Sequence, residues 1–170
     1  MSVIAGKVYN DKIVVAADSI LVKGWSKRTG NFSKLAEIND MIIGGTGTAE
    51  EMSLFFRFAQ THQPETPTEK DILAFATEFA SWKQTNYNNN TFLRNTYLIA
   101  YKGHLFEIDN MFVYEIKDFA AVGAGEDFAN AALYLGHSPE EAVKVACELC
   151  CFVSEPIIKY KMKRDNSNGK

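Results

Sequence analysis

The sequence predicts an α+β fold with two antiparallel sheets, each covered on its outer face by a pair of helices. Three observations lead to this prediction. Strand-like runs come in groups, helical segments come in two pairs, and one strand-like run follows the last helix. Grouped strands and grouped helices are typical of α+β proteins, whereas strict alternation indicates a parallel sheet. A four-layer αββα sandwich fits this order, although the pattern alone does not require it.

Two hairpins are predicted at the start of the chain. Their strands are residues 3–9, 12–18, 34–38 and 41–46, which are rich in β-branched and other apolar residues. The turn dipeptides Asn10-Asp11 and Asn39-Asp40 separate the two strands of each pair. Short polar turns of this kind between apolar runs are typical of hairpins.

Two helices are predicted after the hairpins. Thr48 and Glu51 have the spacing of a capping box and start the first helix, which runs to about Thr61. After a proline-containing link over residues 62–67, Thr68 and Asp71 mark the start of the second helix. The apolar stripes are Met52, Phe55, Phe56 and Ala59 in the first helix, and Ile72, Phe75, Ala76 and Phe79 in the second.

The second half of the chain repeats this order after a polar loop at residues 86–90. A strand meander is predicted over residues 95–101, 105–108, 111–116 and 119–122. A helix over residues 126–135 follows, and Ser138, Pro139 and Glu141 form a strong start signal for another. The fourth helix carries Val143, Ala146, Cys147 and Cys150 on one face. A short strand over residues 156–161 is expected to complete the fold.

Length and composition predict one globular domain over residues 1–170. The 46% hydrophobic and 23% charged content excludes a disordered chain, and 170 residues suffice for a single core. A net charge of −3 argues against a nucleic-acid or anionic-lipid partner. The basic residues near the C-terminus are expected in a polar, flexible tail over residues 162–170. No run is long and apolar enough for a membrane span, and the N-terminus lacks a signal-peptide pattern, so a cytoplasmic protein is expected.

Common local signatures of catalysis are absent. The sequence contains no GxSxG elbow, Walker A loop, HExxH or GxGxxG motif. Cys147 and Cys150 have CxxC spacing without a second pair, which favours buried reduced thiols over zinc. The Gly-Ala-Gly segment at 123–125 is expected to form a tight turn between a strand and a helix, in preference to a phosphate cradle.

Three polar residues at regular spacing carry a resemblance to a known family. Ser2 stands next to the chain start, Asp18 ends an apolar strand sixteen residues later, and Lys34 follows after another sixteen. Together with the segments around them (residues 14–19, 32–35 and 42–50), they resemble the proteasome β-subunit family, and most closely its bacterial branch, the HslV peptidase. In that family the mature chain begins with a nucleophilic threonine, followed by an aspartate and a lysine at these spacings. The resemblance implies an N-terminal-nucleophile hydrolase fold.

Two later segments extend the resemblance to about residue 156. Residues 121–133 resemble the glycine turn and following helix of the family. Residues 151–154 fall where the HslV branch places backbone oxygens around a monovalent cation, which implies a possible sodium site near Glu148, Cys151 and Ser154. The resemblance also places Leu21, Phe32, Ala36 and Gly45 in an apolar substrate pocket. No cofactor is expected for the chemistry itself.

The chemistry of these residues fits hydrolysis of peptide bonds. A serine hydroxyl needs a base, and a free α-amine, with a reference pKa of about 7.7 to 8.0, is a suitable base on the same residue. Ser2 can serve as both only after Met1 is removed, which methionine aminopeptidase is expected to do. Lys34 would stabilise the alkoxide and keep the α-amine neutral, Asp18 would hold Lys34, and the Gly47 N–H would bind the oxyanion. Gly45 is the alternative oxyanion donor.

Two departures from the family pattern keep other functions open. Serine replaces the family's threonine, and Ala124 replaces a serine whose hydroxyl lies near the α-amine, so a proton-relay partner is missing. The expected function is a Ser2-dependent endopeptidase that forms a homo-oligomeric ring and receives peptide or unfolded-protein substrates, with an ATP-dependent unfoldase as a possible partner. The alternatives are a catalytically inactive ring or scaffold protein and an amidase that acts on small substrates.

Overall fold

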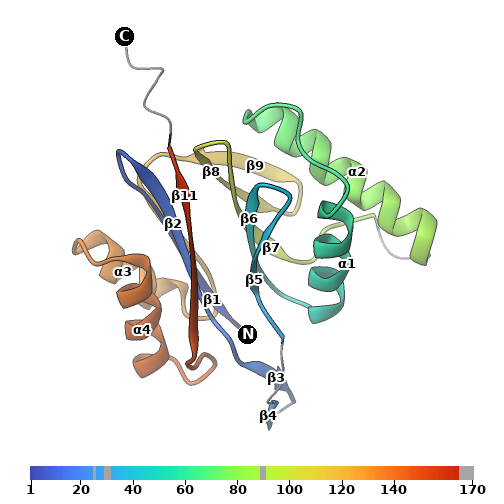
Figure 1. Ribbon diagram of the computed structural model, residues 1–170. Helices are drawn as coiled ribbons and strands as arrows, with labels where there is room; N and C mark the ends of the chain where they lie inside the picture. Colours follow the sequence, from blue (N-terminus) through green and yellow to red (C-terminus); the bar gives the residue numbers. More distant parts are fainter. Residues whose placement is uncertain (25, 29–31, 89–90, 165–170) are drawn as a thin grey trace.

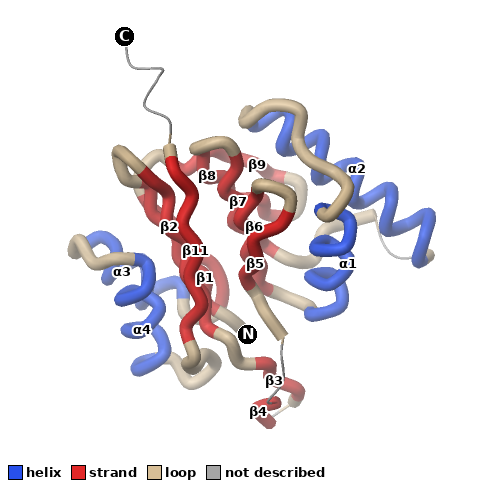
Figure 2. Tube along the Cα trace, viewed as in Figure 1, coloured by secondary structure: helices blue, strands red, loops and turns tan. Residues whose placement is uncertain are grey.

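The computed structural model describes residues 1–24, 26–28, 32–88 and 91–164, which form a four-layer sandwich. Helices α1 (Ala49–Ala59) and α2 (Glu69–Tyr87) cover one sheet, and α3 (Glu126–Tyr134) and α4 (Pro139–Leu149) cover the other (Figure 1). The two sheets lie between the helix pairs, as the secondary-structure colouring shows (Figure 2). The predicted α+β sandwich of two antiparallel sheets is confirmed.

The first sheet has the strand order β10-β1-β2-β11, and every pairing in it is antiparallel. Its strands are β1 (Val3–Val8), β2 (Lys12–Asp18), β10 (Phe119–Gly123) and β11 (Ile157–Lys163). Strand β1 pairs with β10 on one side and with β2 on the other. Ser2, the residue just before β1, therefore lies between these two neighbouring strands.

The second sheet has the order β5-β6-β7-β8-β9 and is also antiparallel. Its strands are β5 (Leu35–Ile38), β6 (Met41–Thr46), β7 (Thr96–Tyr101), β8 (His104–Asp109) and β9 (Phe112–Ile116). Asn39 and Asp40 both have positive φ values, 50° and 59°, which is the backbone of a type I′ hairpin turn.

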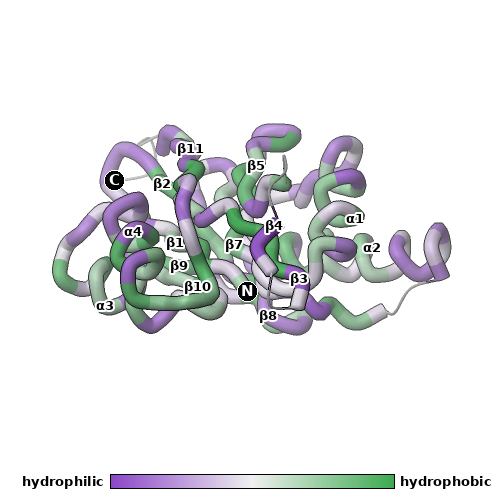
Figure 3. Tube along the Cα trace, turned by 90° about the horizontal axis from the view of Figure 1, so that it is seen from below, coloured by the Kyte–Doolittle hydropathy of each residue, from purple (hydrophilic) through white to green (hydrophobic). Residues whose placement is uncertain are grey.

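Apolar side chains fill the three spaces between the four layers. Ile4, Val15, Leu98 and Leu105 belong to the cluster between the sheets. Phe55, Phe75, Phe79 and Tyr97 belong to the cluster beneath α1 and α2, and Ala129, Leu133, Val143 and Ala146 to the cluster beneath α3 and α4. The hydropathy colouring shows the apolar segments gathered between the outer elements (Figure 3).

Three sequence expectations need correction. The predicted meander is broken, because β10 leaves β9 and pairs with β1 in the other sheet. A short hairpin of β3 (Leu21–Lys23) and β4 (Ser26–Arg28) was not expected, because strands of three residues are too short to show an apolar period. Phe58 is fully buried in α1, whereas Phe56 is only partly buried.

The C-terminal segment is also more ordered than the predicted tail over residues 162–170. Strand β11 continues through Lys163, and the Arg164 side chain donates hydrogen bonds to the carbonyls of Tyr9 and Gly103 at 2.9 Å each. The basic residues Lys159, Lys161 and Lys163 therefore belong to a strand. Residues 165–170 lie outside the described part. Within the described residues, no helix is long and apolar enough to cross a membrane.

Candidate functional site

Ser2, Asp18 and Lys34 meet at the end of the sandwich where the chain begins. Ser2 precedes β1, Asp18 ends β2, and Lys34 precedes β5 in the other sheet. All three are buried, with exposed fractions of 4%, 0% and 3%. Figure 1 shows the N-terminus between the two sheets, near the start of β5. Sheet packing thus brings together three residues that are sixteen positions apart in sequence.

Hydrogen bonds hold these residues in one cluster. The Lys34 ammonium donates to Asp18 Oδ2 at 2.7 Å, and the Val3 N–H donates to Asp18 Oδ1 at 2.9 Å. The Lys34 ammonium also donates to the Met1 carbonyl oxygen at 3.3 Å, and the Ser2 hydroxyl donates to that same oxygen at 2.6 Å. One carbonyl oxygen therefore lies within reach of both the hydroxyl and the ammonium.

Burial governs the charge of Lys34. Loss of solvation lowers the pKa of Lys34 below its usual value, and the charge and hydrogen bond of Asp18 act in the opposite direction. A buried ion pair needs additional hydrogen bonds to offset desolvation, and the Val3 N–H supplies one to the carboxylate. The Lys34 ammonium, which lies close to Ser2, therefore releases its proton more readily than the ammonium of an exposed lysine does.

A glycine turn after β6 also belongs to the site. Gly47 follows β6 with a φ of +129°, and a Cβ there would lie 2.1 Å from Asn95 Oδ1. The position therefore requires glycine on both conformational and steric grounds. Among the described residues we find no hydrogen-bond acceptor for the Gly47 N–H, whereas the Gly45 N–H donates to the Lys34 carbonyl at 3.1 Å. Of the two candidate oxyanion donors, Gly47 has the free N–H.

Asn95 connects the glycine turn to the start of α1. Its Oδ1 accepts from the Thr48 N–H at 2.6 Å, and its Nδ2 donates to the Thr48 carbonyl at 2.9 Å. Thr48 caps α1 by accepting from the Glu51 N–H at 3.4 Å. The expected capping box is only half formed, because the Glu51 side chain does not return to the Thr48 N–H.

Glu51 instead forms a buried network that the sequence did not reveal. Its carboxylate accepts hydrogen bonds from Lys83 at 2.7 Å, from the N–H groups of Arg94 and Asn95, and from the Tyr97 hydroxyl. Burial, followed by the Glu51 charge, raises the pKa of Tyr97 well above its usual value. Lys83 lies four residues after Phe79, at a position where the apolar stripe of α2 would continue. A lysine at such a position could have indicated a buried ion pair.

The glycine turn at 123–125 encloses the backbone of Ser2. The Gly125 N–H donates to the Ser2 carbonyl at 3.3 Å, and a Cβ at Gly123 would lie 2.4 Å from that oxygen. Gly123 has a φ of +103°, so the turn combines a close approach with a backbone that favours glycine. The Ala124 carbonyl accepts from the Cys150 thiol at 3.4 Å.

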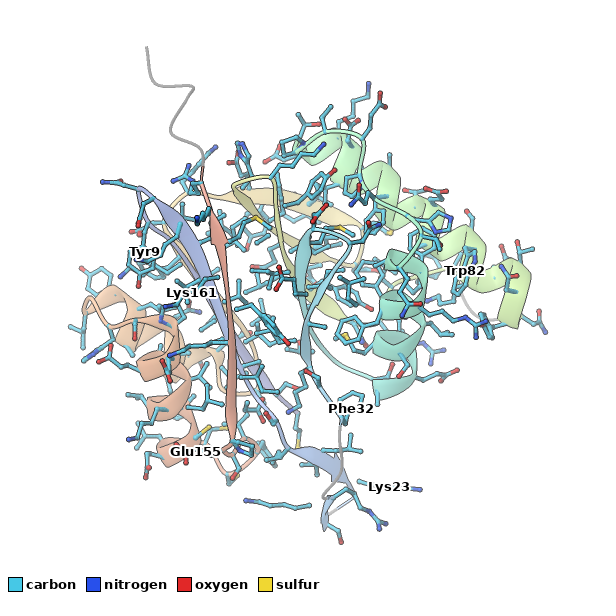
Figure 4. All side chains as sticks on the ribbon, viewed as in Figure 1. Tyr9, Lys23, Phe32, Trp82, Glu155 and Lys161 are labelled. Carbon is cyan, nitrogen blue, oxygen red and sulfur yellow. The ribbon has the colours of Figure 1, made fainter. Side chains whose placement is uncertain are left out.

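A cavity of about 200 Å³ opens beside Ser2. Its lining residues are Met1, Ser2, Ile20, Leu21, Val22, Phe32, Lys34, Gly45, Gly47, Thr48, Ala49, Met52 and Asn95. Leu21, Phe32 and Gly45, three of the four expected pocket residues, are among them. Ala36 lies further along β5 and does not line the cavity. Figure 4 shows Phe32 at the end of the sandwich where the chain begins.

The cysteines and the expected cation site lie at the end of α4. The pKa of Cys147 is raised to about 11, first by burial and then by the charge of Asp18. Cys150 is buried and Cys151 is exposed. No cluster of three or more metal-binding side chains occurs among the described residues. Glu148 lies in the last turn of α4, and Cys151 and Ser154 lie in the link from α4 to β11.

The arrangement can support acyl transfer. It contains a hydroxyl, an adjacent ammonium held by a carboxylate, and the backbone N–H of Gly47, a residue that lines the same cavity. The α-nitrogen of Ser2 would become a base on release of Met1, because an amide nitrogen accepts no proton at neutral pH while an amine does. These groups have the chemical types that a nucleophile, a base and an oxyanion donor require, and they adjoin one cavity.

Comparisons with known proteins agree on the fold. The sequence matches no protein-family model. The chain is similar to the structure of Thiobacillus denitrificans BPH (20% identity, TM-score 0.86), with 96% of this chain and 98% of that chain covered. It is likewise similar to the same BPH in complex with epoxomicin (19% identity, TM-score 0.85, covering 96% and 99%). Eukaryotic HslV from Trypanosoma brucei is also similar (21% identity, TM-score 0.70, covering 95% and 99%). This protein therefore has the fold of HslV.

Proposed function

We propose that this protein is an N-terminal-nucleophile peptidase of the proteasome β-subunit and HslV type, with Ser2 as nucleophile after removal of Met1. The observation that carries the proposal is the Met1 carbonyl oxygen, which accepts from both the Ser2 hydroxyl and the Lys34 ammonium. A nucleophile and a cation that share one oxygen are close enough to act on the same substrate carbonyl.

The proposed reaction has two stages. The Ser2 Oγ attacks the substrate carbonyl carbon while the α-amine takes the hydroxyl proton. The Gly47 N–H stabilises the tetrahedral oxyanion, the carbon–nitrogen bond breaks, and the ammonium of Ser2 returns the proton to the leaving amine. Water then hydrolyses the ester on Ser2 by the same route. Lys34 keeps the α-amine neutral through like-charge proximity, and Asp18 holds Lys34 in place.

The comparisons support this proposal at the level of fold. A shared fold alone does not determine an activity, so the proposal depends on the residues of the site. The structure of BPH with epoxomicin provides a probe for the site, and HslV provides a known peptidase type with the same architecture.

Intact-mass measurement of the purified protein tests the first step. We expect the mass of a chain without Met1, because serine is small enough for methionine aminopeptidase to process the bond before it. Retention of Met1 in every molecule would contradict the proposal, because Ser2 would then have no α-amine.

Activity of a Ser2→Ala variant tests the nucleophile. We expect hydrolysis of apolar fluorogenic peptides and formation of a covalent epoxomicin adduct, with both lost in Ser2→Ala, the hydrolysis by more than about 1,000-fold. Ser53→Ala, at an exposed position in α1, is the control. A Met1-free protein without activity on peptides or small amides would be a scaffold, and one active on small amides alone would be an amidase.

We also propose that the protein assembles as a homo-oligomeric ring in the cytoplasm and receives unfolded chains from an ATP-dependent unfoldase. Several large apolar side chains are exposed in the single chain: Phe112, Tyr134, Leu135 and Leu149, at 62% to 80%. Light scattering coupled to size-exclusion chromatography is expected to give a multiple of the chain mass. A monomer at micromolar concentration would contradict the assembly, but not the chemistry at Ser2.

A monovalent cation is proposed at the end of α4. The C-terminal end of a helix attracts cations, and Glu148, Cys151 and Ser154 lie in or just after the last turn of α4. We expect a lower Tm when sodium chloride is replaced by tetramethylammonium chloride at equal ionic strength. An unchanged Tm would contradict the site.

A further inference from the structure

A second and larger cavity lies on the other side of Met1. Its volume is about 600 Å³, and its lining residues are Met1, Ile20, Val22, Gly24, Lys27, Cys151 and Phe152. Met1, Ile20 and Val22 line both cavities, so the two adjoin. Gly47 and Thr48 line only the first cavity, whereas Cys151 and Phe152 line only the second.

The chemistry at Ser2 assigns different parts of a substrate to the two sides. The oxyanion must face the Gly47 N–H, so the acyl part of a substrate lies toward the first cavity. The leaving amine must lie next to the α-nitrogen of Ser2, because that nitrogen returns its proton. Met1 is bonded to this nitrogen, and so Met1 occupies the space in which the leaving part of a substrate would lie.

We infer that the second cavity binds the side chain of the residue that follows the scissile bond, and that it selects a large apolar residue there. This inference rests on the proposed function and names a substrate preference for the same site. Ile20, Val22 and Phe152 make the lining apolar, and the volume exceeds that of any single side chain and falls in the usual range for ligand pockets. Release of Met1 opens further space in it. In Figure 4, Glu155 marks the link between α4 and β11, the same link in which Phe152 lies.

Partitioning of the acyl-enzyme tests this inference. An added amine can attack the Ser2 ester in place of water, forming a new amide and regenerating the Ser2 hydroxyl. By microscopic reversibility, the amine must occupy the leaving-group side. We therefore compare phenylalaninamide with glycinamide as acceptors for one peptide ester donor, and measure the amide and acid products by mass spectrometry.

We expect wild-type protein to form the phenylalaninamide product about 10- to 100-fold more efficiently than the glycinamide product. The free energy of burying one large apolar side chain corresponds to a factor of this size. Phe152→Ala should bring the ratio close to one, with the acid product taking the place of the phenylalaninamide product. Phe112→Ala is the control, because Phe112 is also an exposed phenylalanine, at 66% against 42% for Phe152, but lies in β9 of the other sheet.

A second perturbation avoids any change of sequence. Iodoacetamide should modify Cys151 first, because Cys151 is exposed, Cys150 is buried, and the pKa of Cys147 is raised to about 11. After this modification, phenylalaninamide should capture less of the acyl-enzyme, and the acid product should increase. Equal use of the two amines by wild-type protein would overturn the inference while donor consumption still supported the peptidase. Failure of wild-type protein to consume any donor would overturn the proposed function and this inference together.

Discussion

Lys34 is the residue whose charge the proposed chemistry uses most directly. It lies between Asp18, which favours its ammonium form, and a buried environment, which disfavours it. Burial is the larger effect, so the pKa of Lys34 is lower than that of an exposed lysine. Loss of one partner in such a pair leaves a buried charge without compensation, at a cost of about 3 to 5 kcal/mol.

The pH dependence of activity should report this shift. We expect kcat/KM to rise with pH as the α-amine loses its proton, around its reference pKa of about 7.7 to 8.0, and to fall again as Lys34 loses its own. The alkaline limb should lie below pH 10.5, the usual pKa of lysine, because burial lowers the pKa of Lys34.

The loss of activity at high pH is not explained by unfolding of the protein when Lys34 loses its proton. A lysine whose pKa is lower in the folded state loses its proton first in the folded state, so its contribution to stability increases with pH between the two pKa values. Circular dichroism should show a folded protein over the window in which activity falls. Activity that stays constant beyond pH 10.5 would show that the Lys34 charge is not required.

At the scale of elements, the start of α1 places the oxyanion donor. Thr48 caps α1, Asn95 at the start of β7 holds both polar groups of the Thr48 backbone, and Glu51 holds the N–H of Asn95. The Gly47 turn is therefore fixed from α1 and from β7 at once. A backbone donor held in this way needs no rearrangement when the oxyanion forms.

Asn95→Ala should weaken catalysis more than binding. We expect kcat to fall by about 10- to 100-fold with a smaller change in KM, because one misplaced oxyanion donor costs up to about 10²- to 10³-fold. Stability should fall by about 1 to 3 kcal/mol, since the Thr48 N–H loses its acceptor. Steady-state kinetics and urea unfolding measure the two effects.

Asn86→Ala is the matched control for this substitution. Asn86 also donates to a backbone carbonyl, that of Trp82 within α2, but it is exposed and does not line the cavity beside Ser2. Its loss should change neither kcat nor the urea midpoint substantially. Equal kinetics in the two variants would show that Asn95 does not position the turn.

At the scale of the whole molecule, the site is divided between the two sheets. Ser2 and Asp18 belong to the sheet of β1 and β2, whereas Lys34 and Gly47 adjoin β5 and β6 of the other. The distance between the sheets therefore sets the distance between nucleophile and oxyanion donor. Gly44 lies where they meet, and a Cβ there would lie 2.9 Å from Ile4 and 3.0 Å from Leu35.

Gly44→Val should separate the sheets and so reduce both stability and activity. Overpacking of a core costs about 1 to 3 kcal/mol, and a shift of the order of 1 Å between catalytic groups can cost about 100-fold in rate. Ala131→Val adds bulk at an exposed position of α3 and should change neither. A Gly44→Val protein with wild-type kcat would show that the sheet spacing does not govern the site.

The local signals in the sequence predicted the elements well where apolar periodicity and caps agree. The Ser138 capping box and the stripe Ile72, Phe75, Ala76 and Phe79 are confirmed as predicted. The pairing of β10 with β1 could not be predicted, because a strand's own residues favour extended backbone but do not specify its neighbour. The β3–β4 hairpin was missed for a related reason, since strands of three residues are too short to show an alternating apolar pattern.

For the site, the sequence by itself determined the residue types and the regular spacing of Ser2, Asp18 and Lys34. Only the tertiary structure decided that they meet, since a spacing of sixteen becomes a contact only when two sheets stack with their strand ends aligned. It also decided that Gly47 has the free N–H and that Met1 lies between two cavities. Hydrogen bonding and burial are properties of packed neighbours from distant segments, and no local pattern in the chain encodes them.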